Sequence, residues 1–136
     1  MKPNAIYAVP PAAPLLTRLR KICSQLPDVT ETVTFGHPTF QVGGKTFAVF
    51  EQYKGEFGLA LKVEQELQQV FLKDPRFYMT PYAGKYGWVT LRMEPKPPDW
   101  KEVREMVRGS YRLVAPNGVA KRNGTTTTSF SAPEQG

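Results

Sequence analysis

Apolar residues recur at three- and four-residue spacing near the start of the chain, in the stretch PLLTRLRKICSQL. This spacing predicts an amphipathic helix over residues 14–26. Pro14 suits its first position, where a missing N–H has no helical partner, and Pro27 ends it. The predicted apolar face consists of Leu15, Leu16, Leu19, Ile22, Cys23 and Leu26. Cys23 is therefore expected to be a small core residue, since free cysteine is among the most buried residue types.

The pattern then changes to a period of two, which is typical of strands. Residues 31–35, 38–42 and 45–52 are rich in β-branched and aromatic side chains and predict three strands. Gly43-Gly44 predicts a tight hairpin turn between the last two strands, because both central positions of such a turn require positive φ.

The same turn predicts a register for the hairpin. The expected pairs are Val42 with Lys45, Gln41 with Thr46, and Phe40 with Phe47. One face is then apolar and is expected to face the core, and it carries Phe40, Val42, Phe47 and Val49. The opposite face carries Thr39, Gln41, Thr46 and Ala48.

The second half of the chain contains three more strand patterns, over residues 56–63, 76–81 and 88–93, with a loop at 82–87. A helical pattern over 63–74 places Leu67, Val70 and Phe71 on one face. The start of this helix has no Ser, Thr, Asp or Asn cap, so its first residue is poorly defined by the sequence.

A third helix is predicted after Pro98. Asp99 followed by Glu102 resembles a capping box at its start. One stripe of this helix is apolar or small and consists of Trp100, Val103, Val107, Ser110, Tyr111 and Val114. A basic stripe beside it consists of Lys101, Arg104, Arg108 and Arg112.

These patterns predict the order α-β-β-β-β-α-β-β-α. Strands joined by short turns, with helices outside the meander, indicate an α+β domain with a mainly antiparallel sheet. We expect residues 1–13 to form an irregular lead and residues 14–115 to form one domain. Residues 116–136 are polar and rich in Gly and Thr, which predicts a disordered tail.

The bulk properties narrow the class of protein. The 136 residues suit a single domain, and the one cysteine excludes a disulfide within the chain. The apolar stretch at 5–16 contains three prolines and is too short to span a membrane, and its basic flank is wrong for a signal peptide. We therefore expect a cytoplasmic protein. A net charge of +6 favours a polyanionic partner.

Five short motifs resemble the MmcQ/YjbR family in order and spacing. They are LP at 26–27, TFGHPTFQVGGKTFAVF at 34–50, GLALK at 58–62, PYAGKYGWVTL at 81–91 and SYRLVA at 110–115. The resemblance covers residues 15–115 and implies a small α+β domain described as frataxin-like or "double wing". It also implies a bacterial cytoplasmic protein of undetermined biochemical role. A nucleic-acid-binding role inferred from the shape of that fold is part of what the resemblance implies.

Two features depart from the family pattern. The segment KVEQ at 62–65 lacks the small polar cap expected there, and the Thr-rich tail lies outside the family region. Both leave open what these segments contribute to function.

The chain's one histidine, His37, has no partners that predict a reaction. One histidine and one core cysteine do not make a zinc site, and no GxSxG elbow accompanies a histidine base. We therefore expect no catalytic residues, no metal and no cofactor. His37 is interpreted as a polar residue between two strands.

The loop PYAGKYGW offers a different kind of site. Lys85 stands between glycines and tyrosines, and lysine with exposed aromatics can hold a phosphate and stack a base. The alternative is a connection whose aromatic residues fill the edge of the core. A small-ligand or enzyme-like pocket would combine this loop with the first hairpin, and its candidate residues are Phe35, His37, Tyr82, Lys85 and Trp88.

The basic stripe of the third helix favours a non-enzymatic module that binds DNA or another polyanion. The candidate contacts are Lys45, Lys85, Lys101, Arg104, Arg108 and Arg112. This hypothesis expects the helical stripe to share a surface with Lys85 or Lys45, whereas Glu105 can pair with Arg108 and weaken it. A protein-interaction adaptor is a third possibility, and the oligomeric state is left open with a monomer as the default.

Overall fold

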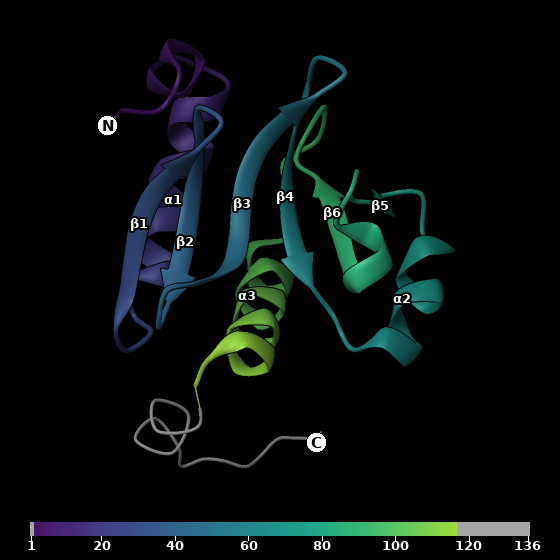
Figure 1. Ribbon diagram of the computed structural model, residues 1–136. Coiled ribbons are helices and arrows are strands. Elements are labelled where there is room, and N and C mark those ends of the chain that lie inside the picture. Colours follow the sequence, from purple (N-terminus) through teal and green to yellow (C-terminus); the bar gives the residue numbers. More distant parts are fainter. Residues whose placement is uncertain (1, 117–136) are drawn as a thin grey trace.

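The computed structural model describes residues 2–116, which form one six-stranded sheet and three α-helices (Figure 1). The order of strands and α-helices along the chain is the predicted one. The predicted disordered tail, 116–136, lies outside the described residues except for Pro116. No helix in residues 2–116 is long and apolar enough to cross a membrane.

All neighbouring strands of the sheet are antiparallel, and their order is β1-β2-β3-β4-β6-β5. The first four strands form a meander in which each turn is tight, and β6 then adds beside β4. Their bounds are β1 Val29–Thr34, β2 His37–Val42, β3 Lys45–Tyr53, β4 Glu56–Lys62, β5 Phe77–Met79 and β6 Trp88–Arg92. This architecture confirms the α+β class predicted from the sequence.

The helices are α1 Ala12–Cys23, α2 Gln65–Leu72 and α3 Trp100–Val114. In Figure 1, α1 lies behind β1 and β2, and α3 lies behind the lower parts of β3 and β4. Helix α1 begins at Ala12 rather than Pro14, because a proline is tolerated anywhere in the first turn, where N–H groups lack helical partners. Asp99 caps α3 as predicted, and its side chain accepts a hydrogen bond from the Lys101 N–H.

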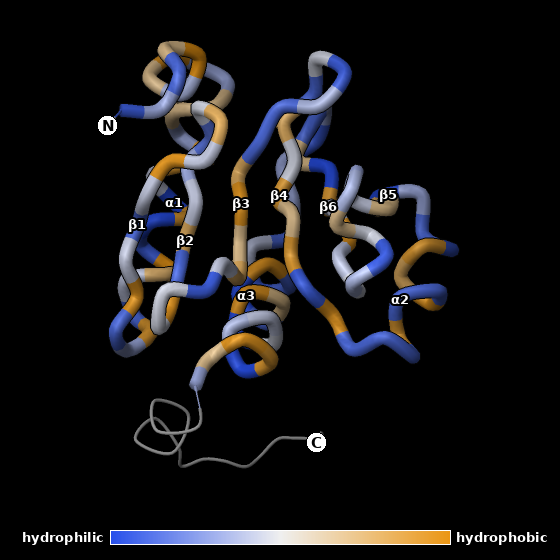
Figure 2. The backbone as a smooth tube through the Cα atoms, viewed as in Figure 1, coloured by the Kyte–Doolittle hydropathy of each residue, from blue (hydrophilic) through white to orange (hydrophobic). Residues whose placement is uncertain are grey.

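The hydrophobic core lies between one face of the sheet and the two helices α1 and α3. Leu19 and Cys23 of α1 and Val103 and Val107 of α3 are buried there, which confirms the predicted core role of Cys23. Figure 2 shows hydrophobic positions along β3, β4 and α3, whereas the β3–β4 turn is hydrophilic. Neither α1 nor α3 covers the opposite side of the sheet, which we call the open face.

The β2–β3 hairpin departs from the predicted register at one point. Val42 pairs with Lys45 and Gln41 with Thr46 as predicted, but Phe40 pairs with Ala48. A β-bulge adds Phe47 to β3, so the predicted pairing of Phe40 with Phe47 is wrong. The shift turns Ala48 toward the core and Val49 toward the open face, which reverses their predicted positions.

The side chain of Ser110 joins α3 to the two central strands. Its hydroxyl donates a hydrogen bond to the Phe47 carbonyl at 2.6 Å and accepts one from the Lys62 N–H at 3.0 Å. Phe47 and Lys62 stand one step beyond Ala48 and Leu61, the last pair of the β3–β4 ladder. The buried hydroxyl therefore bridges two backbone groups where the strands diverge (Figure 1).

The N-terminal lead, predicted to be irregular, contains a short 3-10 helix at Ala5–Ala8 and packs against the β1–β2 hairpin. The Tyr7 hydroxyl lies 2.6 Å from His37 Nδ1, and the Tyr7 ring is buried edge-on against Phe50. The Asn4 N–H donates to the Gly36 carbonyl at 2.9 Å. Burial lowers the pKa of His37, so its neutral form is favoured in the folded state.

The Ser110 bridge predicts a large loss of stability for a small deletion. Ser110→Ala leaves one buried N–H and one buried carbonyl without this partner, and we expect the free energy of unfolding to fall by about 2–3 kcal/mol. Ser24→Ala is the matched control, because the Ser24 hydroxyl bonds Lys21 O at an exposed helix end. Urea unfolding followed by circular dichroism measures both, and we expect the control to change stability by about 0.5 kcal/mol or less. Equal losses would contradict the bridging role.

The environment of His37 predicts a pH dependence. Its pKa is lowered by folding from an unfolded value of about 6.5, so the unfolded state binds more protons as the pH falls. The stability that comes from neutral His37 is therefore complete above the unfolded pKa and is lost as the pH falls through the lower folded pKa. We expect wild type to lose more stability between pH 7.5 and pH 5 than His37→Gln does. Parallel stability-pH profiles for the two proteins would contradict this.

Candidate functional site

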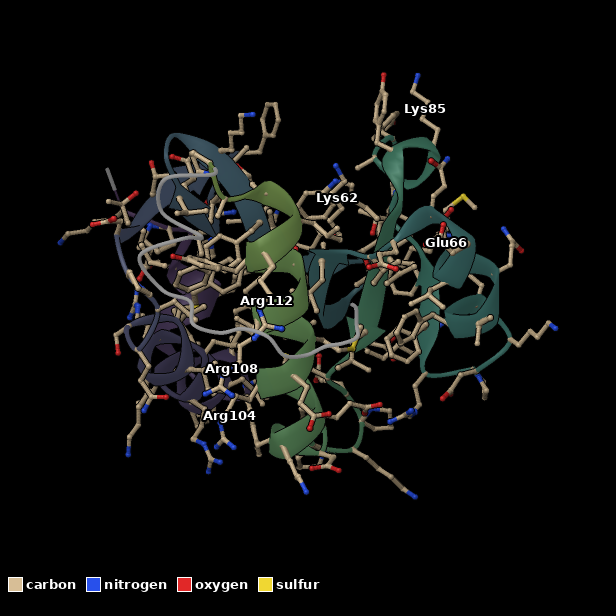
Figure 3. The ribbon with its side chains drawn as sticks, turned by 90° about the horizontal axis from the view of Figure 1, so that it is seen from below. Lys62, Glu66, Lys85, Arg104, Arg108 and Arg112 are labelled. Carbon is tan, nitrogen blue, oxygen red and sulfur yellow. The ribbon has the colours of Figure 1, made fainter. Side chains whose placement is uncertain are left out.

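The arginines of the third helix lie on the outer side of the helical layer. Arg104 and Arg108 are one turn apart on α3 and project on the side of α1 (Figure 3). Arg18 of α1 reaches the same region, since its guanidinium carbon lies 4.9 Å from the centre of the Trp100 ring. We call Arg18, Arg104 and Arg108 the helical basic face.

Arg104 and Arg108 of this face differ from three other arginines in whether they form ion pairs. Arg20, Arg76 and Arg92 each pair with at least one carboxylate, and the partners are Glu31, Asp74, Glu102 and Glu56. Within residues 2–116, neither Arg104 nor Arg108 forms an ion pair. The pairing of Glu105 with Arg108 that the sequence allowed is not formed among these residues. Within the described residues, Arg104 and Arg108 therefore lack carboxylate partners, whereas Arg20, Arg76 and Arg92 are paired.

Three further candidate residues surround this face. Lys101 and Arg112 are exposed on α3, one before and one after the two central arginines. Lys45 begins β3 directly after the Gly43-Gly44 turn, and Pro116 packs on Gly43 just beyond the end of α3. The turn that carries Lys45 thus lies near the C-terminal end of α3.

Lys85 lies elsewhere. Figure 3 shows Lys85 and Lys62 on one side of the molecule, and Arg104 and Arg108 on the other, with the sheet between them. Lys85 belongs to a short 3-10 helix at Gly84–Tyr86 that precedes β6. The six candidate nucleic-acid contacts therefore do not form one surface, because Lys85 is separated from the α3 stripe.

The loop that carries Lys85 is held in place by a residue that the sequence analysis did not single out. Gln68 of α2 is 7% exposed, and its amide donates to the Gly84 carbonyl at 2.7 Å and the Trp88 carbonyl at 3.2 Å. The predicted apolar face of α2 was wrong for Leu67 and Val70, which are exposed, whereas Phe71 packs against the core as predicted. A polar residue such as Gln68 does not register as a core position in a hydrophobic pattern.

The structure does not bring together the five residues of the alternative pocket. Phe35 and His37 lie at the β1–β2 turn, and Glu51 and Arg92 mark the same end of the sheet. Trp88 stands four residues before Arg92 on β6, about 13 Å along the strand, with β3 and β4 between it and β2. Tyr82 and Lys85 precede Trp88. These residues form two separate groups at opposite ends of the sheet.

The one cysteine of the chain is buried, and its one histidine contacts another side chain. Burial raises the pKa of the Cys23 thiol to about 12, and the nearby Glu31 charge adds to the rise. His37 is joined to Tyr7, as described above. Among residues 2–116, no group of three or more His, Cys, Asp or Glu side chains is placed to hold a metal ion.

The comparisons with known proteins agree with this fold. The family model YjbR matches residues 24–113. The structure of protein DR2400 from Deinococcus radiodurans, with the family-model domain DUF419, is similar at a TM-score of 0.66 and 27% identity. That match covers 79% of this chain and 83% of the other. A protein from Pseudomonas syringae shares the fold at a TM-score of 0.63 and 18% identity, over 72% and 97% of the two chains.

No curated protein matches the chain significantly. The family model nevertheless spans the region from the end of α1 to the last turn of α3, including all six strands. It also contains four of the five motifs that carried the resemblance in full, together with most of the fifth. This chain belongs to the YjbR family.

Proposed function

We propose that this protein is a non-enzymatic module that binds DNA through the helical basic face. The observation that supports this most directly is the pair Arg104 and Arg108, which stand one turn apart without carboxylate partners among the described residues. Arg18 adds a third guanidinium from a different helix. Guanidinium groups suit phosphates because their planar donors can bond two oxygens at once.

The guanidinium groups of the face can bind phosphates or the edge of guanine, but the two helices offer no amide side chain that selects adenine. Neither α1 nor α3 contains an asparagine or a glutamine, the residues that commonly recognise adenine. Phosphate contacts position a protein on a duplex and supply affinity without sequence information. We therefore expect binding that depends strongly on salt and weakly on sequence.

The states of Cys23 and His37 support a role without catalysis. A buried thiol with a raised pKa is a poor nucleophile, and the side-chain partner of His37 Nδ1 is the Tyr7 hydroxyl rather than a carboxylate that would orient a catalytic histidine. A DNA-binding role would place the protein in the cytoplasm of a bacterial cell. We take the monomer as the binding unit, since all three arginines come from one chain.

Reversing the two central charges tests the proposal. We expect Arg104→Glu/Arg108→Glu to weaken duplex DNA binding about a hundredfold near 0.15 M salt, because each lost charge-assisted hydrogen bond contributes about 1.5 kcal/mol. The slope of log affinity against log salt should also become shallower by about 0.9 for each lost phosphate contact. Fluorescence anisotropy of a labelled duplex, titrated at several salt concentrations, measures both.

The matched control is Lys54→Glu/Lys73→Glu, which makes the same change in net charge at exposed positions on the β3–β4 turn and after α2. We expect the control to retain most of the affinity. Equal losses in both double variants would show that net charge alone drives binding. Binding that disappears at 0.15 M salt in the wild type would remove the proposal.

A further inference from the structure

The loop between β5 and β6 presents exposed side chains from a rigid base. Tyr82 is 97% exposed and Tyr86 is 64% exposed, and Lys85 between them is exposed as well. Tyr82 adopts a φ of 64°, a left-handed conformation that is uncommon for an aromatic residue. Such outliers persist only where the surrounding structure holds them, and they concentrate at binding sites.

The surrounding structure holds this loop from three directions. The buried Gln68 amide bonds the carbonyls of Gly84 and Trp88, as described above. The Val63 N–H donates to the Gly87 carbonyl at 2.9 Å. A Cβ at Gly84 would lie 2.1 Å from Met79 Cγ, so the loop packs directly on β5. The exposed residues are thus positioned before any partner arrives, which lowers the entropic cost of binding.

The strands beside the loop add another aromatic residue and another lysine on the open face of the sheet. Trp88 begins β6 and pairs with Lys62 at the end of β4, and both side chains belong to the open face. Lys85 Nζ lies 5.2 Å from the centre of the Tyr86 ring. Figure 3 shows Lys62 and Lys85 projecting to the same side of the molecule. We call Lys62, Lys85, Tyr86 and Trp88 the loop–strand platform.

The acidic residues nearest in sequence do not pair with the lysines of the platform. The side chain of Glu66 raises the pKa of the Glu64 carboxyl. Within the described part of the chain, neither forms an ion pair with Lys62 or Lys85. The acidic residues on the open face itself, Glu51 and Glu56, stand toward the other end of the strands, and Glu56 pairs with Arg92.

We infer that the loop–strand platform is a binding site for single-stranded nucleic acid. Two lysines suit successive phosphates, and two partly exposed aromatic rings suit the faces of unpaired bases. A duplex does not offer those base faces, because its bases are stacked on one another. The site uses no residue of the helical basic face and lies on the other side of the sheet, so it stands independently of the proposed duplex binding.

The test compares a 12-nucleotide oligothymidylate with a duplex, by anisotropy at 0.15 M salt. We expect Lys85→Glu/Tyr86→Ala to weaken oligothymidylate binding at least tenfold and to leave duplex binding within twofold. Tyr86→Phe keeps the ring and should retain most of the affinity. Arg104→Glu/Arg108→Glu should change oligothymidylate binding less than threefold, which separates this site from the helical basic face.

A spectroscopic readout locates the single strand without relying on charge. The chain has two tryptophans, so Trp88 is the one remaining tryptophan in Trp100→Phe, and excitation at the red edge of the absorption band avoids the tyrosines. We expect oligothymidylate to quench the Trp88 emission, because a stacked base lies against the indole. The inference is overturned if oligothymidylate does not bind, if the Trp88 emission is unchanged at saturation, or if the Arg104/Arg108 variant abolishes both ligands together.

Discussion

The hydroxyl of Ser110 is the contact on which the arrangement of this domain depends. It satisfies a carbonyl of β3 and an N–H of β4 at the point where the two strands separate. The same region contains the bulge at Phe47, whose ring packs edge-on against Tyr111 with centroids 5.5 Å apart. Helix α3 is therefore attached to the sheet by a buried polar bridge and an aromatic contact in addition to the apolar packing of Val103 and Val107, and Arg108 on its outer side is exposed.

The attachment of α3 to the sheet determines the direction in which its charged side chains point. Arg104 and Arg108 each follow a buried valine by one residue, which is about 100° around the helix. With Val103 and Val107 buried, the two arginines therefore point away from the core, on the side of α1 (Figure 3). The sheet then separates them from the lysines of the open face. The net charge of the chain does not show this separation. The helical layer and the β5–β6 loop present two cationic surfaces with different neighbours. One is flanked by helices and guanidinium groups, and the other by aromatic rings.

The structure was predicted correctly from the sequence where a single local pattern determines it. Helical spacing identified the buried stripe of α3, the Asp99 cap marked its start, and Gly43-Gly44 identified the turn. The prediction failed where contacts between two distant elements determine the structure. The bulge places Phe47 where it contacts Ser110 and Tyr111 of α3. The burial of Gln68 depends on carbonyls that lie 16 and 20 residues further along the chain. Neither contact leaves a periodic pattern in the sequence. The separation of Lys85 from α3 in space could not be predicted from the sequence either.

The most direct test of this account is an NMR titration that follows the arginine Nε–H signals as duplex DNA is added. We expect the signals of Arg18, Arg104 and Arg108 to shift, because their side chains contact the phosphates. The signals of Arg20, Arg76 and Arg92 should stay in place, since these side chains are held by carboxylates. Shifts confined to the second group, or spread equally over all six, would contradict the helical basic face as the DNA-binding surface.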